Sequence, residues 1–140
     1  MTNTRPRDRL GRPLPYGSVG VVPVSEAPLP PEETLALVRE LLRQGRPFSA
    51  HEVLEARWKS CPDAERDLWQ GLAQLAVGLT HEGRGNFVGA ARLLTRGAGH
   101  LEAYAATGGT AYGLPLRGLA ARARRRAQLA ATDAGATASP

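Results

Sequence analysis

Two short glycine-containing turns limit most tightly what this chain can fold into. One lies at Gly45 and the other is the run Gly83-Arg84-Gly85-Asn86. The segments on both sides of each turn repeat apolar residues every three to four positions, which is the period of an α-helix. Because a very short connection places two helices side by side and antiparallel, the sequence predicts two helical hairpins. No segment shows the apolar–polar alternation of a strand.

Proline, glycine and asparagine mark the ends of the predicted helices. Proline is tolerated in a first helical turn, glycine is common just past a helix end, and asparagine is a good N-cap. These signals predict helices from Pro31 to the residue before Gly45, Pro47 to Cys61, Asp63 to Glu82, Asn86 to Tyr104 or Ala105, and Pro115 to Ala131. The predicted fold class is all-α: a small helical bundle of two antiparallel hairpins plus a C-terminal helix, with an irregular N-terminal strap.

Composition divides the chain into three parts. Residues 1–30 hold six prolines and three glycines and form an irregular arm. We expect the first dozen residues to be mobile. The segment from Val19 to Val24 is a candidate for a packed strap, because burial of its apolar valines is favourable. Residues 31–107 form the helical core domain. Residues 108–140 form an Arg- and Ala-rich helix followed by a disordered tail from Asp133.

Several classes of protein are excluded by simple counts. The single cysteine, Cys61, rules out an internal disulfide and a multi-cysteine zinc module. No apolar run approaches the ~20 residues of a membrane span, and no apolar signal stretch follows the N-terminus. We therefore expect a cytoplasmic protein with no membrane contact.

The excess positive charge lies outside the central segment. The net charge of +5 divides into +2 for residues 1–30, −1 for residues 31–107 and +4 for residues 108–140. The C-terminal arginines are candidates for a weak nucleic-acid contact, and a basic solubilising tail is the alternative. No aromatic residue interleaves with them to stack on bases. These arginines are Arg117, Arg122, Arg124, Arg125 and Arg126.

The second predicted helix carries an unusual polar group at the edge of its apolar face. His51 and Glu55 are four residues apart and therefore adjacent on the helix surface. Trp58 follows on nearly the same line, whereas Glu52 points to another side. This arrangement places an imidazole, a carboxylate and an indole at a boundary between core and water.

The third predicted helix carries a matching polar stripe of Gln70, Gln74 and His81. Gly71 and Gly78 lie beside it, and each glycine costs roughly 0.8–1 kcal/mol relative to alanine in a helix. Their presence predicts a close approach by another helix. The glutamines should consequently be half-buried and in need of hydrogen-bond partners.

Three interpretations of this polar group remain open. It is a structural network that sets the register of the helices, a small-molecule or anion site, or a metal site. The metal candidates are His51 and Glu55, with His81 as a further ligand. Because residue 55 is glutamate, the two-histidine H-E-x-x-H motif is absent. We expect no metal and no other cofactor.

Three separated blocks of sequence resemble one known family. Residues 48–58, 70–76 and 81–90, in that order, resemble the bacterial and archaeal family catalogued as domain of unknown function 309. The resemblance extends from about residue 33 to 104 and implies a small all-α bundle without an established activity. The polar positions of the family correspond here to His51, Glu52, Glu55, Gln70, Gln74, His81 and Asn86.

These observations favour a non-catalytic binding or interaction module over an enzyme. Its polar and aromatic groove is predicted near His51, Glu55, Trp58, Gln70 and Gln74, with Glu52, His81 and Asn86 as further candidate binding residues. The partner would be a small molecule or a protein. The alternative function is a metal-dependent hydrolase that uses His51 and Glu55.

Overall fold

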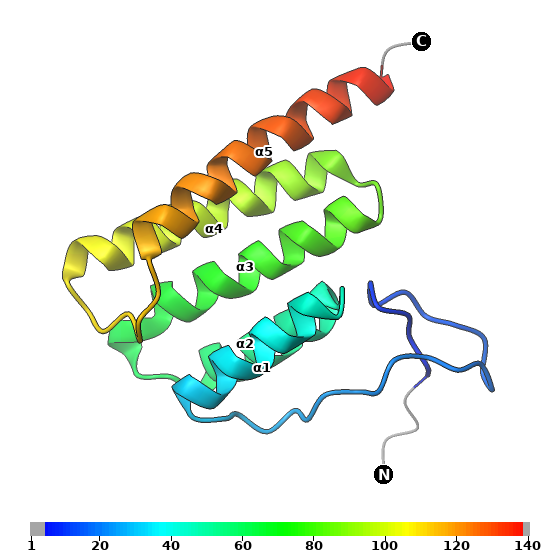
Figure 1. Ribbon diagram of the computed structural model, residues 1–140, viewed down its shortest axis with the longest axis horizontal. Coiled ribbons are helices and arrows are strands. Elements are labelled where there is room, and N and C mark those ends of the chain that lie inside the picture. The colour runs from blue at the N-terminus through cyan, green and yellow to red at the C-terminus, as the bar shows by residue number, and fades with distance from the viewer. Residues whose placement is uncertain (1–4, 139–140) are drawn as a thin grey trace.

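The computed structural model describes residues 5–138, which form an all-α bundle (Figure 1). Within this range an isolated β-bridge joins Arg7 to Pro13, and no strand is present. The predicted fold class is therefore confirmed. The helices are α1 (Pro31–Arg43), α2 (Pro47–Ser60), the short 3₁₀ helix η1 (Asp63–Glu65), α3 (Arg66–Gly83), α4 (Phe87–Thr107) and α5 (Leu116–Ala138).

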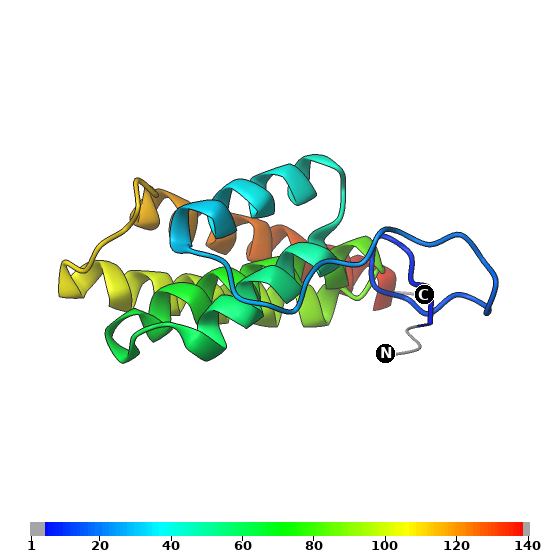
Figure 2. The same ribbon diagram turned by 90° about the horizontal axis from the view of Figure 1, so that it is seen from below.

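The helices pack mainly in the order of the chain. Helix α1 packs against α2, α2 against α3, α3 against α4 and α4 against α5. Figure 1 shows the α1–α2 hairpin on one side of α3, with α4 and α5 on the other side. In the view of Figure 2, α1 lies above α3 and α4, on the same side as the start of α5. Helix α3 is consequently covered by both a preceding and a following helix, as its two glycines predicted.

Both hairpin turns use a residue with a positive φ angle. Gly45 has a φ of 69° and Gly85 a φ of 77°, a region that residues with a side chain rarely adopt. The second turn leads directly into α4, where the Asn86 side chain accepts a hydrogen bond from the backbone N–H of Gly89 at 3.0 Å. Asn86 is therefore the N-cap that the sequence predicted.

The hydrophobic core joins all five helices. Leu54 of α2, Trp69 of α3 and Tyr104 of α4 are fully buried in it. Helix α5 contributes a stripe of small residues, Ala120 and Ala123 among them. Because alanine side chains are short, α5 lies close along α4, and the core extends beyond residue 107 into the C-terminal helix.

Glycines bring α3 and α4 into close contact. A Cβ atom built on Gly97 would lie 2.9 Å from the backbone oxygen of Gly71, and one built on Gly78 would lie 2.8 Å from Leu94. Real Cβ atoms do not approach other heavy atoms so closely, so no larger residue fits without movement of the helices. The predicted close approach of a helix at Gly71 and Gly78 is confirmed.

Residues 5–12 are folded against the bundle, whereas the sequence predicted that the first dozen residues are mobile. Leu10 is only 2% exposed and lies over Gly83, and the Arg84 side chain donates to the Leu10 carbonyl at 2.5–2.9 Å. Gly11 packs directly on the ring of Phe48. Within the valine segment, Val24 packs against the core as expected, whereas Val22 is 75% exposed. Residues 1–4 lie outside the described residues.

The C-terminal tail differs from the prediction as well. Helix α5 continues through Asp133 to Ala138, whereas a disordered tail was expected from residue 133. Alanine has the highest helix propensity, and the buried Ala127 and Ala130 hold the preceding turns in place. The helix therefore propagates past its last packed turn. Residues 139 and 140 lie outside the described residues.

Candidate functional site

One stripe of α2 carries the polar residues that the sequence singled out. Phe48, His51, Glu55 and Trp58 follow one another at intervals of three or four residues, so they lie on one line along the helix. The rings of Phe48 and His51 are in tilted contact, with 5.6 Å between their centroids. Helix α2 begins at Pro47, which places this stripe within its first three turns.

A corresponding stripe on α3 faces it. The guanidinium of Arg66 lies 5.2 Å from the centre of the Trp58 ring, at the start of α3. At the other end of α3, the guanidinium of Arg84 lies 5.9 Å from the centre of the Phe48 ring. These two contacts show that α2 and α3 are antiparallel and fix which faces meet. We call this region the α2–α3 seam: Phe48, His51, Glu55 and Trp58 of α2 with Arg66, Gln70 and Gln74 of α3, closed by Arg84.

His51 and Glu55 are in direct contact, as their spacing predicted. His51 Nε2 lies 2.8 Å from one carboxylate oxygen of Glu55, and Lys59 Nζ lies 3.0 Å from the other. The hydrogen bond from Lys59 lowers the pKa of Glu55, and the neighbouring His51 lowers it further. Burial lowers the pKa of His51 and outweighs the opposing effect of the Glu55 carboxylate. At neutral pH the seam therefore holds a neutral imidazole beside an ionised carboxylate.

Three buried polar atoms of the seam have no hydrogen-bond partner among the described residues. They are Nδ1 of His51, Nε1 of Trp58 and Oε1 of Gln74. A buried donor or acceptor left unpaired costs about 1–3 kcal/mol. Native proteins rarely tolerate such groups without a reason, such as a bound ligand or ordered water.

The other predicted site residues are divided between two further places. His81 Nδ1 lies 3.1 Å from the Asn86 side-chain nitrogen at the turn between α3 and α4, and Asn86 is already occupied as a helix cap. Glu52 lines a cavity of about 220 Å³ together with Arg7 of the N-terminal arm and Phe48. Burial raises the pKa of Glu52. His51, Glu55 and Trp58 therefore lie on the α2 side of the seam and Gln70 and Gln74 on its α3 side. Glu52, His81 and Asn86 lie at other places.

The histidine, cysteine and acidic side chains of residues 5–138 include the predicted metal candidates His51, Glu55 and His81. In this range no three His, Cys, Asp or Glu side chains are grouped so that they could hold a metal ion. Instead, His51 is in contact with Glu55, and His81 lies within hydrogen-bond distance of Asn86.

Sequence reasoning overlooked a second polar centre at Glu65. The carboxylate of Glu65 accepts a hydrogen bond from Trp69 Nε1 at 3.0 Å, and the Tyr112 hydroxyl lies 2.8–2.9 Å from both of its oxygens. Nη2 of Arg57 lies 3.8 Å from one carboxylate oxygen of Glu65. These contacts tie the loop before α5 to the start of α3. The spacing of four residues between Glu65 and Trp69 was the available signal, but Tyr112 is too distant in sequence to be foreseen.

The C-terminal arginines have different surroundings. Arg124 pairs with Glu102 and Arg126 pairs with Glu82, each at 2.6 Å. Among the described residues, Arg117, Arg122 and Arg125 have no such carboxylate partner. Two of the five candidate nucleic-acid contacts are thus already neutralised by helices α3 and α4.

The pKa shift of His51 predicts a loss of stability in acid. The unfolded histidine has a pKa of about 6.5, and the folded value lies below it, so the unfolded chain binds more protons in between. The free energy of unfolding should therefore fall as the pH drops below about 6.5. His51→Gln should reduce this fall, measured as the urea midpoint at successive pH values. His81→Gln should reduce it less, because His81 is less deeply buried. An equal pH dependence in the wild type and His51→Gln would contradict the assignment.

The helices of the described region differ from membrane-spanning helices. None of them combines the length and the apolar character needed to cross a bilayer.

Comparisons with known proteins agree with the resemblance noted in the sequence. Residues 35–93 match the model of a family described as Domain of unknown function (DUF309). Over 57 residues, the chain is 44% identical to "Uncharacterized protein YpuF" of Bacillus subtilis (strain 168). This alignment covers 40% of the present chain and 33% of that relative, so the chain spans about a third of the relative's length. No solved structure matches the chain significantly. The matched residues include the whole of the α2–α3 seam.

Proposed function

We propose, for a chain whose residues 35–93 belong to the DUF309 family, that it is a non-catalytic binding module of the cytoplasm. Its ligand is a small polar molecule, and its site is the α2–α3 seam. The observation that carries this proposal is the set of unpaired buried atoms of His51, Trp58 and Gln74. All three come from the two stripes that face each other.

The chemistry of these atoms describes the ligand. The Trp58 indole can only donate a hydrogen bond, and the Gln74 oxygen can only accept one. Because the neutral His51 imidazole donates from Nε2 to the Glu55 carboxylate, its Nδ1 carries no proton and can only accept a hydrogen bond. Arg66 and Arg84 lie at the two ends of the seam and favour a neutral or negatively charged molecule. A compound with an adjacent N–H donor and carbonyl acceptor, such as an amide, matches this set.

A binding site and a purely structural network predict opposite effects of Gln74→Leu on the free energy of unfolding. In a binding site, an unpaired group is retained at a cost, and its removal stabilises the empty protein. Gln74→Leu should therefore raise the free energy of unfolding by about 1 kcal/mol, measured by urea denaturation. Gln70→Leu is the matched control, because Gln70 is half-buried on the same stripe without an unpaired buried atom, and it should change stability by less than about 0.5 kcal/mol. A loss of stability in Gln74→Leu would show that the seam is a structural network.

Ligand binding to the seam can be measured by NMR from the indole N–H resonances of Trp58 and Trp69. Acetamide at millimolar concentration is the simplest probe with both an amide donor and a carbonyl acceptor. We expect it to shift the Trp58 indole resonance in a proton–nitrogen correlation spectrum, and to leave Trp69 unmoved because that indole already donates to Glu65. The shift should be lost in Gln74→Leu. Equal shifts at both indoles, or no shift at Trp58, would contradict the proposed site.

A further inference from the structure

A long apolar groove lies on a different side of the molecule from the seam. It has a volume of about 530 Å³ and is bounded by α1 and α5, with α3 as its floor. We call it the α1–α5 groove. None of the seam residues lines it. Its walls on α1 and α3 are formed by Leu35, Val38, Leu42, Leu72, Leu75 and Leu79.

The two helices beside the groove leave apolar side chains without cover. Helix α5 packs on α4 through its alanine stripe and turns a second stripe, which includes Leu119 and Leu129, toward the groove. Leu129 is 66% exposed, and Leu42 of α1 is exposed on the opposite wall. Within residues 5–138, α1 packs against α2 and α5 against α4, without extensive contact between α1 and α5. The apolar stripes of the two helices are therefore available to a partner.

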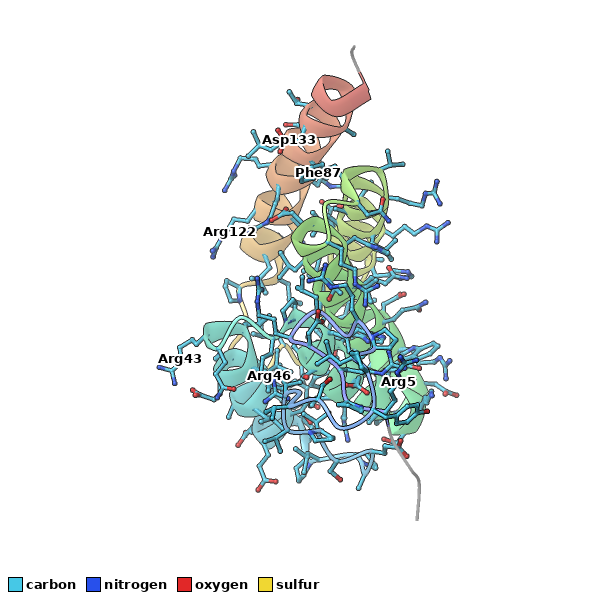
Figure 3. All side chains as sticks on the ribbon, turned by 90° about the vertical axis from the view of Figure 1, so that its right-hand side faces the viewer. Arg5, Arg43, Arg46, Phe87, Arg122 and Asp133 are labelled. Atoms are coloured by element: carbon cyan, nitrogen blue, oxygen red, sulfur yellow. The ribbon has the colours of Figure 1, made fainter. Side chains whose placement is uncertain are left out.

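The rim of the groove is positively charged. Arg39 of α1 and Arg122, Arg125 and Arg126 of α5 line it, and no acidic residue does. Among the described residues, Arg126 is the only one of these four arginines that is paired with a carboxylate, that of Glu82. Figure 3 shows Arg122 of α5 and Arg43, at the end of α1, extending on the same side of the molecule. A partner that fills the groove must consequently bring negative charge at both of its edges.

The dimensions of the groove suit an α-helix. From Leu35 to Leu42 and from Leu72 to Leu79 each wall spans eight residues, or about 10 Å at a rise of 1.5 Å per residue. Along α5 the lining extends from Leu119 to Leu129, which corresponds to about 15 Å. Two to three helical turns of a partner would therefore fit between α1 and α5.

We propose that the α1–α5 groove binds an acidic amphipathic helix of a partner protein. Its apolar residues at positions i, i+3, i+4 and i+7 would lie on the leucines of α1, α3 and α5. Carboxylates on its flanks would pair with Arg39 on one wall and with Arg122 and Arg125 on the other.

Other occupants fit the groove less well. A second copy of this chain, bound about a two-fold axis, would bring the arginine rim against itself. A membrane surface is flat, whereas these leucines lie in a concave groove. This proposal goes beyond the function proposed for the seam, and because the two regions share no residue, each can fail without the other.

The proposal is tested with a synthetic helix. The probe is a bridged, fluorescein-labelled peptide of about twelve residues, with leucines at i, i+3, i+4 and i+7 and glutamates elsewhere. Fluorescence anisotropy with the full chain should show saturable binding that weakens as salt is added. A peptide with lysine in place of every glutamate should not bind.

Variants of exposed residues localise the binding. Leu129→Glu and the double variant Arg122→Glu/Arg125→Glu should each weaken binding by about tenfold or more. Val88→Glu is the matched control, because Val88 is 61% exposed on α4 outside the groove, and it should bind as the wild type does. Circular dichroism checks that each variant is folded. Equal binding of the lysine peptide, unchanged affinity in the groove variants, or no binding of the glutamate peptide would overturn the proposal. It would also be overturned by a dimer that Leu129→Glu dissociates, or by binding to vesicles of anionic phospholipid without binding to the peptide.

Discussion

Replacement of Trp69 by alanine should lower the free energy of unfolding by about 3–5 kcal/mol, the range for large buried aromatic residues. The Trp69 side chain is fully buried in the core, and its indole donates to Glu65. It also lies in contact with the Tyr112 ring, with 5.8 Å between the ring centroids, and beneath the Arg57 guanidinium at 5.4 Å. Its removal therefore leaves a cavity and an incomplete polar centre at the junction of α2, α3 and the loop before α5.

Urea denaturation followed by far-ultraviolet circular dichroism measures this loss. Trp69→Phe is the matched variant, since it keeps an aromatic ring in the core and removes only the N–H donor and part of the volume. We expect it to lose about 1–2 kcal/mol. A loss of less than about 1 kcal/mol in Trp69→Ala would show that Trp69 is not a central residue of the core.

Gly97→Val should lower the free energy of unfolding by about 2–3 kcal/mol, because overpacking forces side chains and backbone to shift. The new Cβ would lie 2.9 Å from the Gly71 backbone oxygen, which belongs to α3 and has little freedom to move. Helices α3 and α4 would have to separate along their contact. The change affects the pair of helices with the most extensive contact in the bundle.

Gly99→Val is the control for this experiment, on the same helix and two residues away. The nearest atom to a Cβ at Gly99 is the end of the flexible Arg124 side chain, at 4.0 Å. We expect this variant to change the free energy of unfolding by less than about 0.5 kcal/mol, since glycine is a poor helix former and the space is open. Equal urea midpoints for Gly97→Val and Gly99→Val would contradict the close contact of α3 with α4.

Much of the fold followed from local chemistry. Gly45 and Gly85 adopt the positive φ angles that end or connect helices, and Asn86 caps α4. Each of these effects involves residues within a few positions of one another, so they can be read from the sequence. The contact between His51 and Glu55 is of the same kind, because four residues make one turn of a helix.

Contacts between distant parts of the chain account for what was missed at the N-terminal arm, at Glu65 and at the groove. The Asp8 side chain forms a local turn in the N-terminal arm, but Leu10 is held on the bundle by Gly83 and Arg84, more than seventy positions away. Tyr112 reaches Glu65 in the same way. The α1–α5 groove was not foreseen either, since its walls come from helices at opposite ends of the chain.

The sequence by itself determined that the chain forms helices, where most of them begin and end, and which polar residues share a helix face. These properties depend on backbone conformation and on hydrogen bonds within one or two turns. Only the tertiary structure decided that the stripe of α2 faces that of α3, that Glu52 and Asn86 lie apart from it, and that α1 and α5 enclose a groove. The physical reason is that helices pack through the fit of whole side-chain surfaces, and this fit involves residues far apart in the sequence.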